Sequence, residues 1–311
     1  MTENKKCTII GCGFVGASTA YSLTGTGLFN ELVLIDVDKK RAIGEAMDIS
    51  HGLPFLAPMT VHAGEYADMA GSQVIIIAAG SGQKPGETRL SLLSRNMRIF
   101  DSIATELVKY AGDAVILVVT NPVDILTYYT LQKTGFPASR VIGSGTVLDT
   151  ARLKQCLGKE LQVDSRNIHA FVLGEHGDSE FPVWSSANVS GMDISHFDAD
   201  EKRLQEIFEE VRDSAYTIIE GKGATYYGIA QSVKRICAAI MRNEHSVLTV
   251  STLLSGTWGI SDVCMGVPAI VGRGGVAHIF EISLSAEEEK KLQASASILK
   301  REYETTISYS V

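Results

Sequence analysis

Short apolar runs alternate with helical patterns through the first half of the chain. The apolar runs lie at 7–11, 31–36, 72–80, 114–120 and 140–145, and the helical patterns lie around 14–27, 38–50, 88–110 and 122–134. Near-continuous apolar runs are typical of strands buried on both faces, and a helix between two runs is long enough to connect parallel strands. The sequence therefore predicts an α/β fold with a doubly wound parallel sheet.

The strict alternation weakens after about residue 145, where a second domain is expected to begin. A chain of 311 residues is long for a single hydrophobic core. An amphipathic helix is predicted over 198–220, and a capping box formed by Ser285 and Glu288 is expected to open a final helix. We therefore expect a first domain at 1–145 and an α+β domain at 146–311.

Composition and charge exclude several classes of partner. Lys and Arg number 28 against 36 Asp and Glu, and no long basic run occurs, so nucleic acid and anionic membranes are not expected partners. No apolar run approaches the ~18 residues of a membrane span, and the amino terminus lacks a signal-peptide pattern, so we expect a cytoplasmic protein. The five cysteines have no CxxC or Cys/His ligand spacing, which predicts reduced thiols and no metal site.

A glycine motif follows the first predicted strand and opens the first predicted helix. Its sequence is Gly11-Cys-Gly13-Phe14-Val15-Gly16. Such glycines permit a tight turn, close approach of a pyrophosphate to the backbone and tight helix packing. Asp36 ends the second strand at the distance along the chain expected for a carboxylate that binds the adenosine ribose, and it would repel a 2′-phosphate. These features predict a Rossmann-type domain that binds NAD rather than NADP.

A polar, glycine-flanked histidine, His176, follows an apolar run and is expected to face a cleft. Hydride transfer to a carbonyl requires a proton donor, a cation near the oxygen and a clamp for the rest of the substrate. Side chains of suitable chemistry stand at the ends of predicted elements: Arg89, Asn121, Asp149, Arg152 and Thr225. From the residues alone, a structural role stays open for His176. A helix cap and an i,i+3 ion pair likewise stay open for Asp149 and Arg152.

Seven motifs along the chain extend these observations. They are GCGFVGAS, IDVD, SGQKPGETR, VVTNPVD, SGTVLDTARLK, LGEHGDSEFPVWS and ATYYGIA. In this order and spacing the chain resembles the lactate and malate dehydrogenase superfamily over essentially its whole length. The resemblance, which is to bacterial members, implies an NAD-dependent oxidoreductase that interconverts pyruvate and L-lactate.

The resemblance also assigns roles residue by residue. It implies that His176 is the proton donor and acceptor, that Asp149 is its carboxylate partner and that Arg152 binds the substrate carboxylate. It further implies that Arg89 lies on a mobile loop and polarises the carbonyl, and that Asn121 and Thr225 line the pocket. The residues implied to bind the cofactor are Gly11, Gly13, Phe14, Val15, Gly16, Asp36 and Asn121.

Substrate choice is expected to depend on Gln83. In the resemblance this position faces the far end of the substrate, where Gln is typical of lactate dehydrogenases and Arg of malate dehydrogenases. Without a countercharge the second carboxylate of oxaloacetate would lose about 4 kcal/mol at an effective dielectric of ~20. Two alternatives stay open: a malate or other L-2-hydroxy-acid dehydrogenase, and a non-catalytic NAD-binding protein.

An effector site is the last expectation. Relatives activated by fructose 1,6-bisphosphate carry an Arg and a His at positions that correspond here to Lys154 and His169. Lys154 departs from the pattern but keeps the positive charge, so we expect weaker phosphate binding across a subunit dyad. The resemblance also implies a homotetramer.

Overall fold

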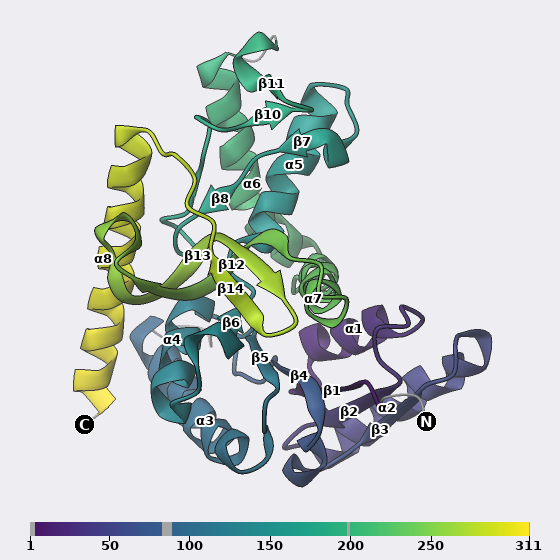
Figure 1. The fold of residues 1–311 in the computed structure, drawn as a ribbon. Coiled ribbons are helices and arrows are strands. Elements are labelled where there is room, and N and C mark those ends of the chain that lie inside the picture. Colours follow the sequence, from purple (N-terminus) through teal and green to yellow (C-terminus); the bar gives the residue numbers. More distant parts are fainter. Residues whose placement is uncertain (1–3, 83–88, 198–199, 311) are drawn as a thin grey trace.

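The computed structural model describes residues 4–82, 89–197 and 200–310 (Figure 1). A nine-stranded sheet runs through the molecule in the order β14-β13-β12-β6-β5-β4-β1-β2-β3. Its strands are β1 (Lys6–Ile10), β2 (Glu31–Ile35), β3 (Thr60–Ala63), β4 (Ser72–Ile77), β5 (Val115–Val118), β6 (Val141–Gly143), β12 (Ser246–Ser255), β13 (Ser261–Gly272) and β14 (Gly275–Ile279). Strands β1 to β6 are parallel. Strands β12 to β14 extend the sheet from β6, and each of them pairs antiparallel with the strand before it in the sheet.

The parallel half has the strand order of a doubly wound dinucleotide-binding fold, which confirms the predicted fold class. All five predicted strands form, but they end up to three residues earlier than their apolar runs. Strand β3 was not predicted, because this edge strand has four residues and buries only Val61. The strand order reverses between β1 and β4, and the crevice at such a point is where this fold binds ligands.

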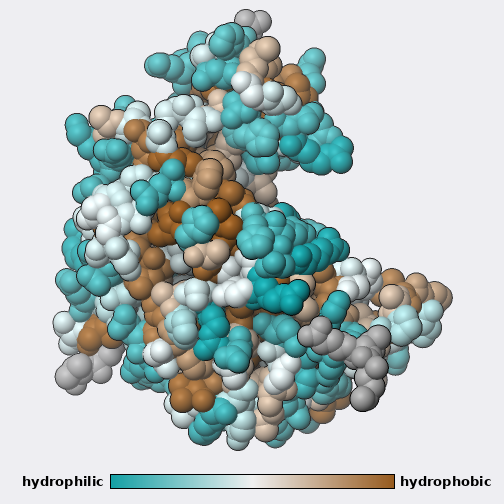
Figure 2. All heavy atoms as spheres, viewed as in Figure 1, coloured by the Kyte–Doolittle hydropathy of each residue, from teal (hydrophilic) through white to brown (hydrophobic). Residues whose placement is uncertain are grey.

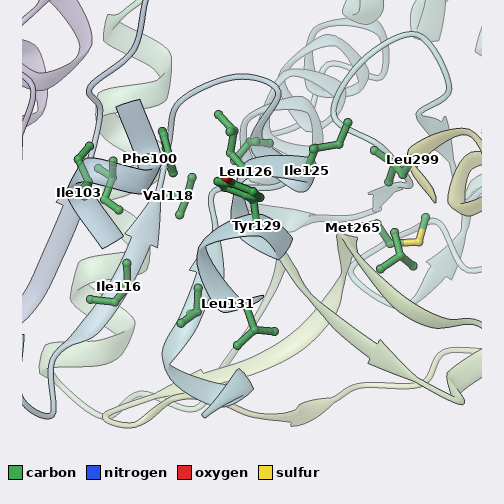
Figure 3. Packing of buried hydrophobic residues seen from close by; sticks show 14 of the residues in the cluster. Phe100, Ile103, Ile116, Val118, Ile125, Leu126, Tyr129, Leu131, Met265 and Leu299 are labelled. Atoms are coloured by element: carbon green, nitrogen blue, oxygen red, sulfur yellow. The ribbon is translucent and has the colours of Figure 1, made fainter. Parts of the chain in front are cut away.

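Helices cover both faces of the sheet because successive strand residues point to opposite sides. On one face the strands pack against α1 (Phe14–Leu23), α2 (Lys39–Gly52) and α7 (Tyr227–Met241). On the other face they pack against α3 (Arg89–Tyr110), α4 (Val123–Thr134) and α8 (Ala286–Ser310). Figure 3 shows the second core, where Phe100 of α3 is 1% exposed. Truncation of such a buried phenylalanine to alanine costs about 3–5 kcal/mol.

The remaining elements form a smaller lobe with its own core. Helix α5 (Val147–Glu160) packs on α6 (Glu201–Lys222), and apolar residues of both helices share a core with residues of β7, β8 and β10. The short strands of this part of the chain are β7 (Ile168–His169), β8 (Val172–Leu173), β9 (Phe181–Pro182), β10 (Asn188–Val189) and β11 (Met192–Asp193). The apolar run at 168–173 is thus two short strands rather than one. Figure 2 shows hydrophilic side chains over most of this lobe and apolar ones near the centre of the same face.

Both predicted helix signals of the second half form. Helix α6 begins after Asp200, whose side chain accepts a hydrogen bond from the Arg203 N–H, and it ends at Gly223 with φ +84°. In the capping box before α8, the Ser285 N–H donates to the Glu288 carboxylate and the Glu288 N–H donates to the Ser285 hydroxyl. None of the helices in the described ranges is long and apolar enough to cross a membrane.

Candidate active site

The glycine motif forms a tight turn between β1 and α1. Gly11 has φ +98°, and a Cβ there would lie 2.4 Å from the Ala79 nitrogen of the neighbouring strand connection. A Cβ on Gly16 would overlap the carbonyl oxygen of Gly11, whereas one on Gly13 would point into open space. Helix α1 has no side-chain cap, so its first N–H groups face that space. The turn therefore fits a pyrophosphate lying against Gly13.

Asp36 stands directly after β2, and the backbone holds its carboxylate in place. Its Oδ2 accepts a hydrogen bond of 2.7 Å from the Cys12 N–H, and its Oδ1 accepts one of 2.9 Å from the Asp38 N–H. Each oxygen keeps a further lone pair, so the carboxylate can still accept hydrogen bonds from ribose hydroxyls. This geometry fits the role predicted for Asp36.

Thr225 lies two residues before α7, the helix that packs on α1. The ring of Tyr226, the next residue, stacks on Phe14 with centroids 5.3 Å apart. The Lys222 ammonium lies 3.3 Å from the Tyr226 ring centroid. Helix α7 thus begins beside the predicted cofactor loop. Phe14 and Tyr226 both lie in motifs noted from the sequence, but the sequence did not predict that their rings are in contact.

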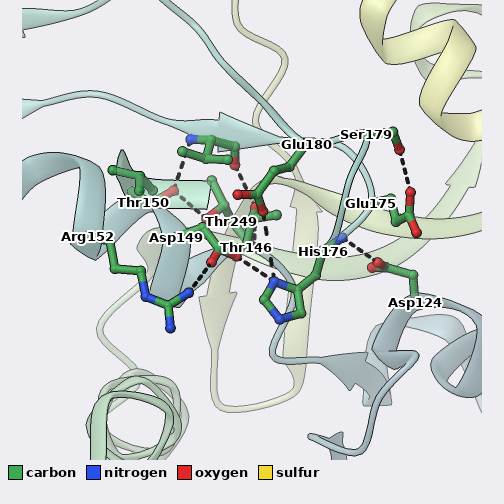
Figure 4. A network of polar contacts seen from close by, with 12 residues as sticks. Asp124, Thr146, Asp149, Thr150, Arg152, Glu175, His176, Ser179, Glu180 and Thr249 are labelled. Carbon is green, nitrogen blue, oxygen red and sulfur yellow. Dashed lines mark hydrogen bonds and ion pairs between the residues drawn. The ribbon is translucent and has the colours of Figure 1, made fainter. Parts of the chain in front are cut away.

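The catalytic candidates converge where α5 meets the segment after β8 (Figure 4). Asp149 lies in the first turn of α5, and its side chain is 2% exposed. Its Oδ2 accepts a hydrogen bond of 2.6 Å from Nδ1 of His176, whose side chain is 24% exposed. Burial alone would lower the pKa of His176, but the charge and hydrogen bond of Asp149 outweigh it and raise this pKa to about 9. This pKa favours a charged imidazolium at neutral pH, which fits the predicted role of proton donor.

Arg152 binds the other oxygen of Asp149. Its Nη1 donates a hydrogen bond of 2.9 Å to Asp149 Oδ1, so the i,i+3 ion pair considered from the sequence does form. The pair does not exclude the predicted role, because a guanidinium has five N–H donors and the bond to Asp149 uses one of them. Arg152 and His176 are thus two cations held by one buried carboxylate.

Two further buried carboxyl groups adjoin this pair, and sequence reasoning missed both. Asp124 of α4 accepts a 2.8 Å hydrogen bond from the His176 N–H, and burial raises the pKa of Asp124 to about 6. Glu180 places its Oε2 3.9 Å from His176 Nδ1. Both residues stand in motifs noted from the sequence, Asp124 in VVTNPVD and Glu180 in LGEHGDSEFPVWS, but neither was assigned a role.

The C-terminal helix holds the segment that carries His176. The Ser295 hydroxyl of α8 accepts a 2.8 Å hydrogen bond from the Glu175 N–H and lies 2.9 Å from the Ser179 hydroxyl. Ser295 is fully buried, and a Cβ on Gly174 would lie 2.9 Å from its oxygen. Helix α8 therefore fixes the backbone on both sides of His176.

A cavity of about 550 Å³ opens beside His176. Its lining includes Asn121, predicted from the sequence, together with Leu93, Tyr216 and Thr306. A volume of this order accommodates a small ligand. At its edge the Asn96 side chain accepts a hydrogen bond from the Ser81 N–H and donates one to the Asn121 carbonyl.

Some predicted residues are not brought to this cavity. Gln83 lies outside the described residues, and for Arg89 the structure describes only the backbone, which begins α3 rather than lying in a loop. Lys154 lies on α5 and is half-buried, and His169 is exposed on β7. Burial lowers the pKa of Lys154.

The five cysteines are free thiols. Cys12 of the glycine turn is buried, and burial followed by the charge of Asp36 raises its pKa to about 12. It is therefore a packing residue rather than a nucleophile.

Comparison with known proteins gives full-length matches. Residues 5–143 match the family model of the lactate/malate dehydrogenase NAD binding domain, and residues 146–309 match that of the lactate/malate dehydrogenase alpha/beta C-terminal domain. The chain is 52% identical to L-lactate dehydrogenase 1 of Clostridium acetobutylicum, over 96% of this chain and 98% of that protein. It is also 52% identical to an L-lactate dehydrogenase of Priestia megaterium, over 96% of each.

Solved structures agree with these matches. A crystal structure of the minor L-lactate dehydrogenase of Enterococcus mundtii, in a ligands-bound form, superposes with a TM-score of 0.94 at 41% identity and covers 98% of this chain and 99% of that one. A lactate dehydrogenase from a deep-sea metagenome library of the Medee basin gives a TM-score of 0.95 at 43% identity, with the same coverage. The NAD-binding prediction is confirmed by the first family model. The chain belongs to the lactate/malate dehydrogenase family.

Proposed function

We propose that this protein is an NAD-dependent L-lactate dehydrogenase, which interconverts pyruvate and L-lactate. The observation that carries the proposal is the hydrogen bond of 2.6 Å between His176 and the buried Asp149, beside Arg152 and a cavity of small-molecule size. Relatives about 50% identical along nearly the whole chain are named L-lactate dehydrogenases. This name supports the substrate assignment.

His176 supplies the proton in the proposed reaction. In the direction of pyruvate reduction, its Nε2–H donates to the carbonyl oxygen while the imidazolium charge stabilises the developing alkoxide. Asp149 accepts a hydrogen bond from Nδ1 of His176. The ring therefore keeps its orientation, and its remaining proton stays on Nδ1 after the Nε2 proton has been transferred. In the reverse direction the neutral imidazole accepts the hydroxyl proton of lactate.

Arg152 is proposed to bind the carboxylate of the substrate. A guanidinium offers two parallel N–H donors to a carboxylate, and its remaining donors are available after the bond to Asp149. Asn121 and Thr225 are proposed to line the pocket, and Arg89 is proposed to polarise the carbonyl.

The glycine turn and Asp36 would hold the cofactor. Gly13 leaves room for the pyrophosphate at the start of α1, with Phe14, Val15 and Asn121 nearby in the proposed site. When bound, NADH supplies the hydride. The carboxylate of Asp36 repels a 2′-phosphate and so favours NAD.

Gln83 is proposed to set the preference for pyruvate, and the direct test compares substrates. We expect kcat/KM for pyruvate to exceed that for oxaloacetate by at least about a hundredfold, given the missing countercharge. A preference for oxaloacetate would instead make the protein a malate dehydrogenase. Tight NADH binding without turnover of either substrate would make it a non-catalytic NAD-binding protein.

A fructose 1,6-bisphosphate site at Lys154 and His169 is also proposed. Support comes from the positive charge of Lys154 two residues after Arg152, which would couple an effector to the carboxylate clamp. We expect millimolar bisphosphate to lower the pyruvate KM in the wild type and to lower it less in His169→Gln, which lacks the imidazole. The site would be excluded if the pyruvate KM were the same with and without bisphosphate. It would also be excluded if bisphosphate lowered the KM of His169→Gln as much as that of the wild type.

We further propose a homotetramer, with domains at 1–145 and 146–311 and a cytoplasmic location. Exposed apolar side chains on α2 and just after it support self-association: Ile43, Met47, Phe55 and Leu56. Sedimentation equilibrium is the measurement that tests the assembly. A monomer at micromolar concentration would contradict it.

A further inference from the structure

Glu180 is a buried carboxyl group for which the proposed reaction has no role. Its side chain is 4% exposed and that of Asp149 is 2% exposed. Its Oε2 lies 3.9 Å from His176 Nδ1, the nitrogen that also bonds to Asp149. One oxygen of Asp149, one of Glu180 and one nitrogen of His176 all lie within 4.8 Å of one another.

Two buried carboxyl groups this close together do not both ionise, because like charges repel strongly away from water, so one of them keeps its proton. The negative charge is more stable on Asp149 than on Glu180, because Asp149 accepts hydrogen bonds from both Arg152 and His176. Glu180 contacts the same His176 nitrogen at the longer distance of 3.9 Å. The proton therefore belongs to Glu180.

We propose that Glu180 is a positioning residue that works as a neutral acid, donating a hydrogen bond to Asp149 and so fixing the carboxylate that orients His176 and Arg152. In agreement with this assignment, burial followed by the charge of Asp149 raises the pKa of Glu180 to about 9. The protonation state of Glu180 is inferred independently of the proposed function, whereas its expected effect on kcat/KM for pyruvate rests on that function.

The net charge of the cluster explains why a neutral Glu180 would favour substrate binding. With Glu180 protonated, Arg152 and His176 contribute two positive charges and Asp149 one negative charge. The net charge of +1 matches a substrate with one carboxylate. With Glu180 ionised the net charge would be zero, and substrate binding would leave an excess negative charge in a buried place.

Other charged groups surround the cluster. Asp124 accepts a hydrogen bond from the backbone of His176, and its charge contributes to the raised pKa of His176. On its other side Glu180 lines a groove between α6 and α8, where the charged residues are Glu201, Glu287, Glu288 and Lys291. The Glu288 carboxylate there accepts hydrogen bonds from Ser185 and Ser285.

Three variants separate the possibilities. Glu180→Gln keeps a neutral donor of the same shape, and Glu180→Met removes the donor at similar volume. Glu288→Gln is the matched control, because Glu288 is also a buried glutamate but lies outside the catalytic cluster. Difference infrared spectroscopy of wild type against each Gln variant at pH 7 detects a protonated carboxyl group, and the pH profile of kcat/KM for pyruvate reports on His176.

We expect the protonated-carboxyl band to be lost in Glu180→Gln and unchanged in Glu288→Gln. Glu180→Gln should keep kcat within about twofold of wild type and leave the upper limb of the pH profile in place. Glu180→Met should lower kcat/KM at least about tenfold, because a hydrogen bond to a charged group is lost. Rescue by Gln but not by Met is the signature of a donor.

The proposal would be overturned if the difference spectrum of wild type against Glu180→Gln showed no protonated-carboxyl band. It would also be overturned if the upper limb of the pH profile of kcat/KM shifted by a full pH unit in Glu180→Gln, because either result would show that Glu180 is ionised. Wild-type kinetics in Glu180→Met would also overturn it. If Glu180→Met does not fold, Glu180→Ala tests the loss of the donor. The infrared result does not depend on turnover, so it separates failure of this inference from failure of the proposed function.

Discussion

Replacement of Asp149 by Asn should move the pH range in which the enzyme works. In the wild type the charge and hydrogen bond of Asp149 overcome burial and raise the pKa of His176 from 6.5 to about 9. The amide that replaces the carboxylate is neutral, and burial remains, so the pKa of His176 should fall to 6.5 or below. The difference amounts to about 3 kcal/mol between the two protonation states.

The effect on rate has two parts. At pH 7.5 the protonated fraction of His176 should fall from roughly 97% to roughly a tenth, which is a tenfold loss. Arg152 and the imidazole also lose a charged hydrogen-bond partner, which costs about another ten- to hundredfold. We therefore expect kcat/KM for pyruvate to fall about 10²- to 10³-fold, with partial recovery as the pH is lowered towards 6.

The assay is kcat/KM for pyruvate at saturating NADH between pH 5.5 and 10. Asp164→Asn is the control, because Asp164 also pairs with an arginine of the same lobe, Arg166, but is exposed. It should keep the wild-type profile. An upper limb that stays near pH 9 in Asp149→Asn would refute the assignment of this carboxylate as the cause of the raised pKa.

Three other predictions test the site. Asp36→Ser should relax the preference for NADH over NADPH in kcat/KM, because the variant lacks the carboxylate that repels a 2′-phosphate; equal use of both cofactors by the wild type would contradict this. Gln83→Arg should shift the ratio of kcat/KM from pyruvate towards oxaloacetate, and an unchanged ratio would mean that Gln83 does not face the substrate. The raised pKa of His176 means that the folded protein binds this proton more tightly than the unfolded chain does. Its stabilisation should be complete below pH 6.5 and lost as the pH rises through about 9, so the difference in melting temperature between wild type and His176→Gln should shrink over that range.

The fold was largely predictable because its signals are local. The short apolar runs at 31–36 and 114–120 are typical of strands buried on both faces, and the capping box at Ser285 is a contact between residues three apart. The short strands of the small lobe carry no such signal. The run at 168–173 divides because Val172 pairs with Pro182 while Ile168 pairs with Val189, and these partners lie outside any local window.

The candidate site was predictable to the extent that its residues lie in motifs. His176, Asp149 and Arg152 are brought together by the structure as the resemblance implied. Glu180 was missed because its importance comes from burial next to Asp149, which is 31 positions away in the sequence. The same holds for Ser295, since a serine within an amphipathic helix gives no indication that it holds the segment around His176.

The parallel and antiparallel parts of the sheet meet where β12 pairs with β6, and this pairing limits which fragments of the chain can be expressed separately. Strand β12 pairs with β6 at Ser251 and Gly143, where a Cβ on Gly143 would lie 2.9 Å from the Ser251 Cβ. Gly145 has φ +52°, and a Cβ there would lie 2.4 Å from the Ser251 nitrogen. A truncated fragment that ends at residue 145 would leave the backbone of β6 as a bare apolar edge, and such edges recruit other chains. The cofactor-binding half should therefore aggregate when expressed alone, although it matches a family domain of its own.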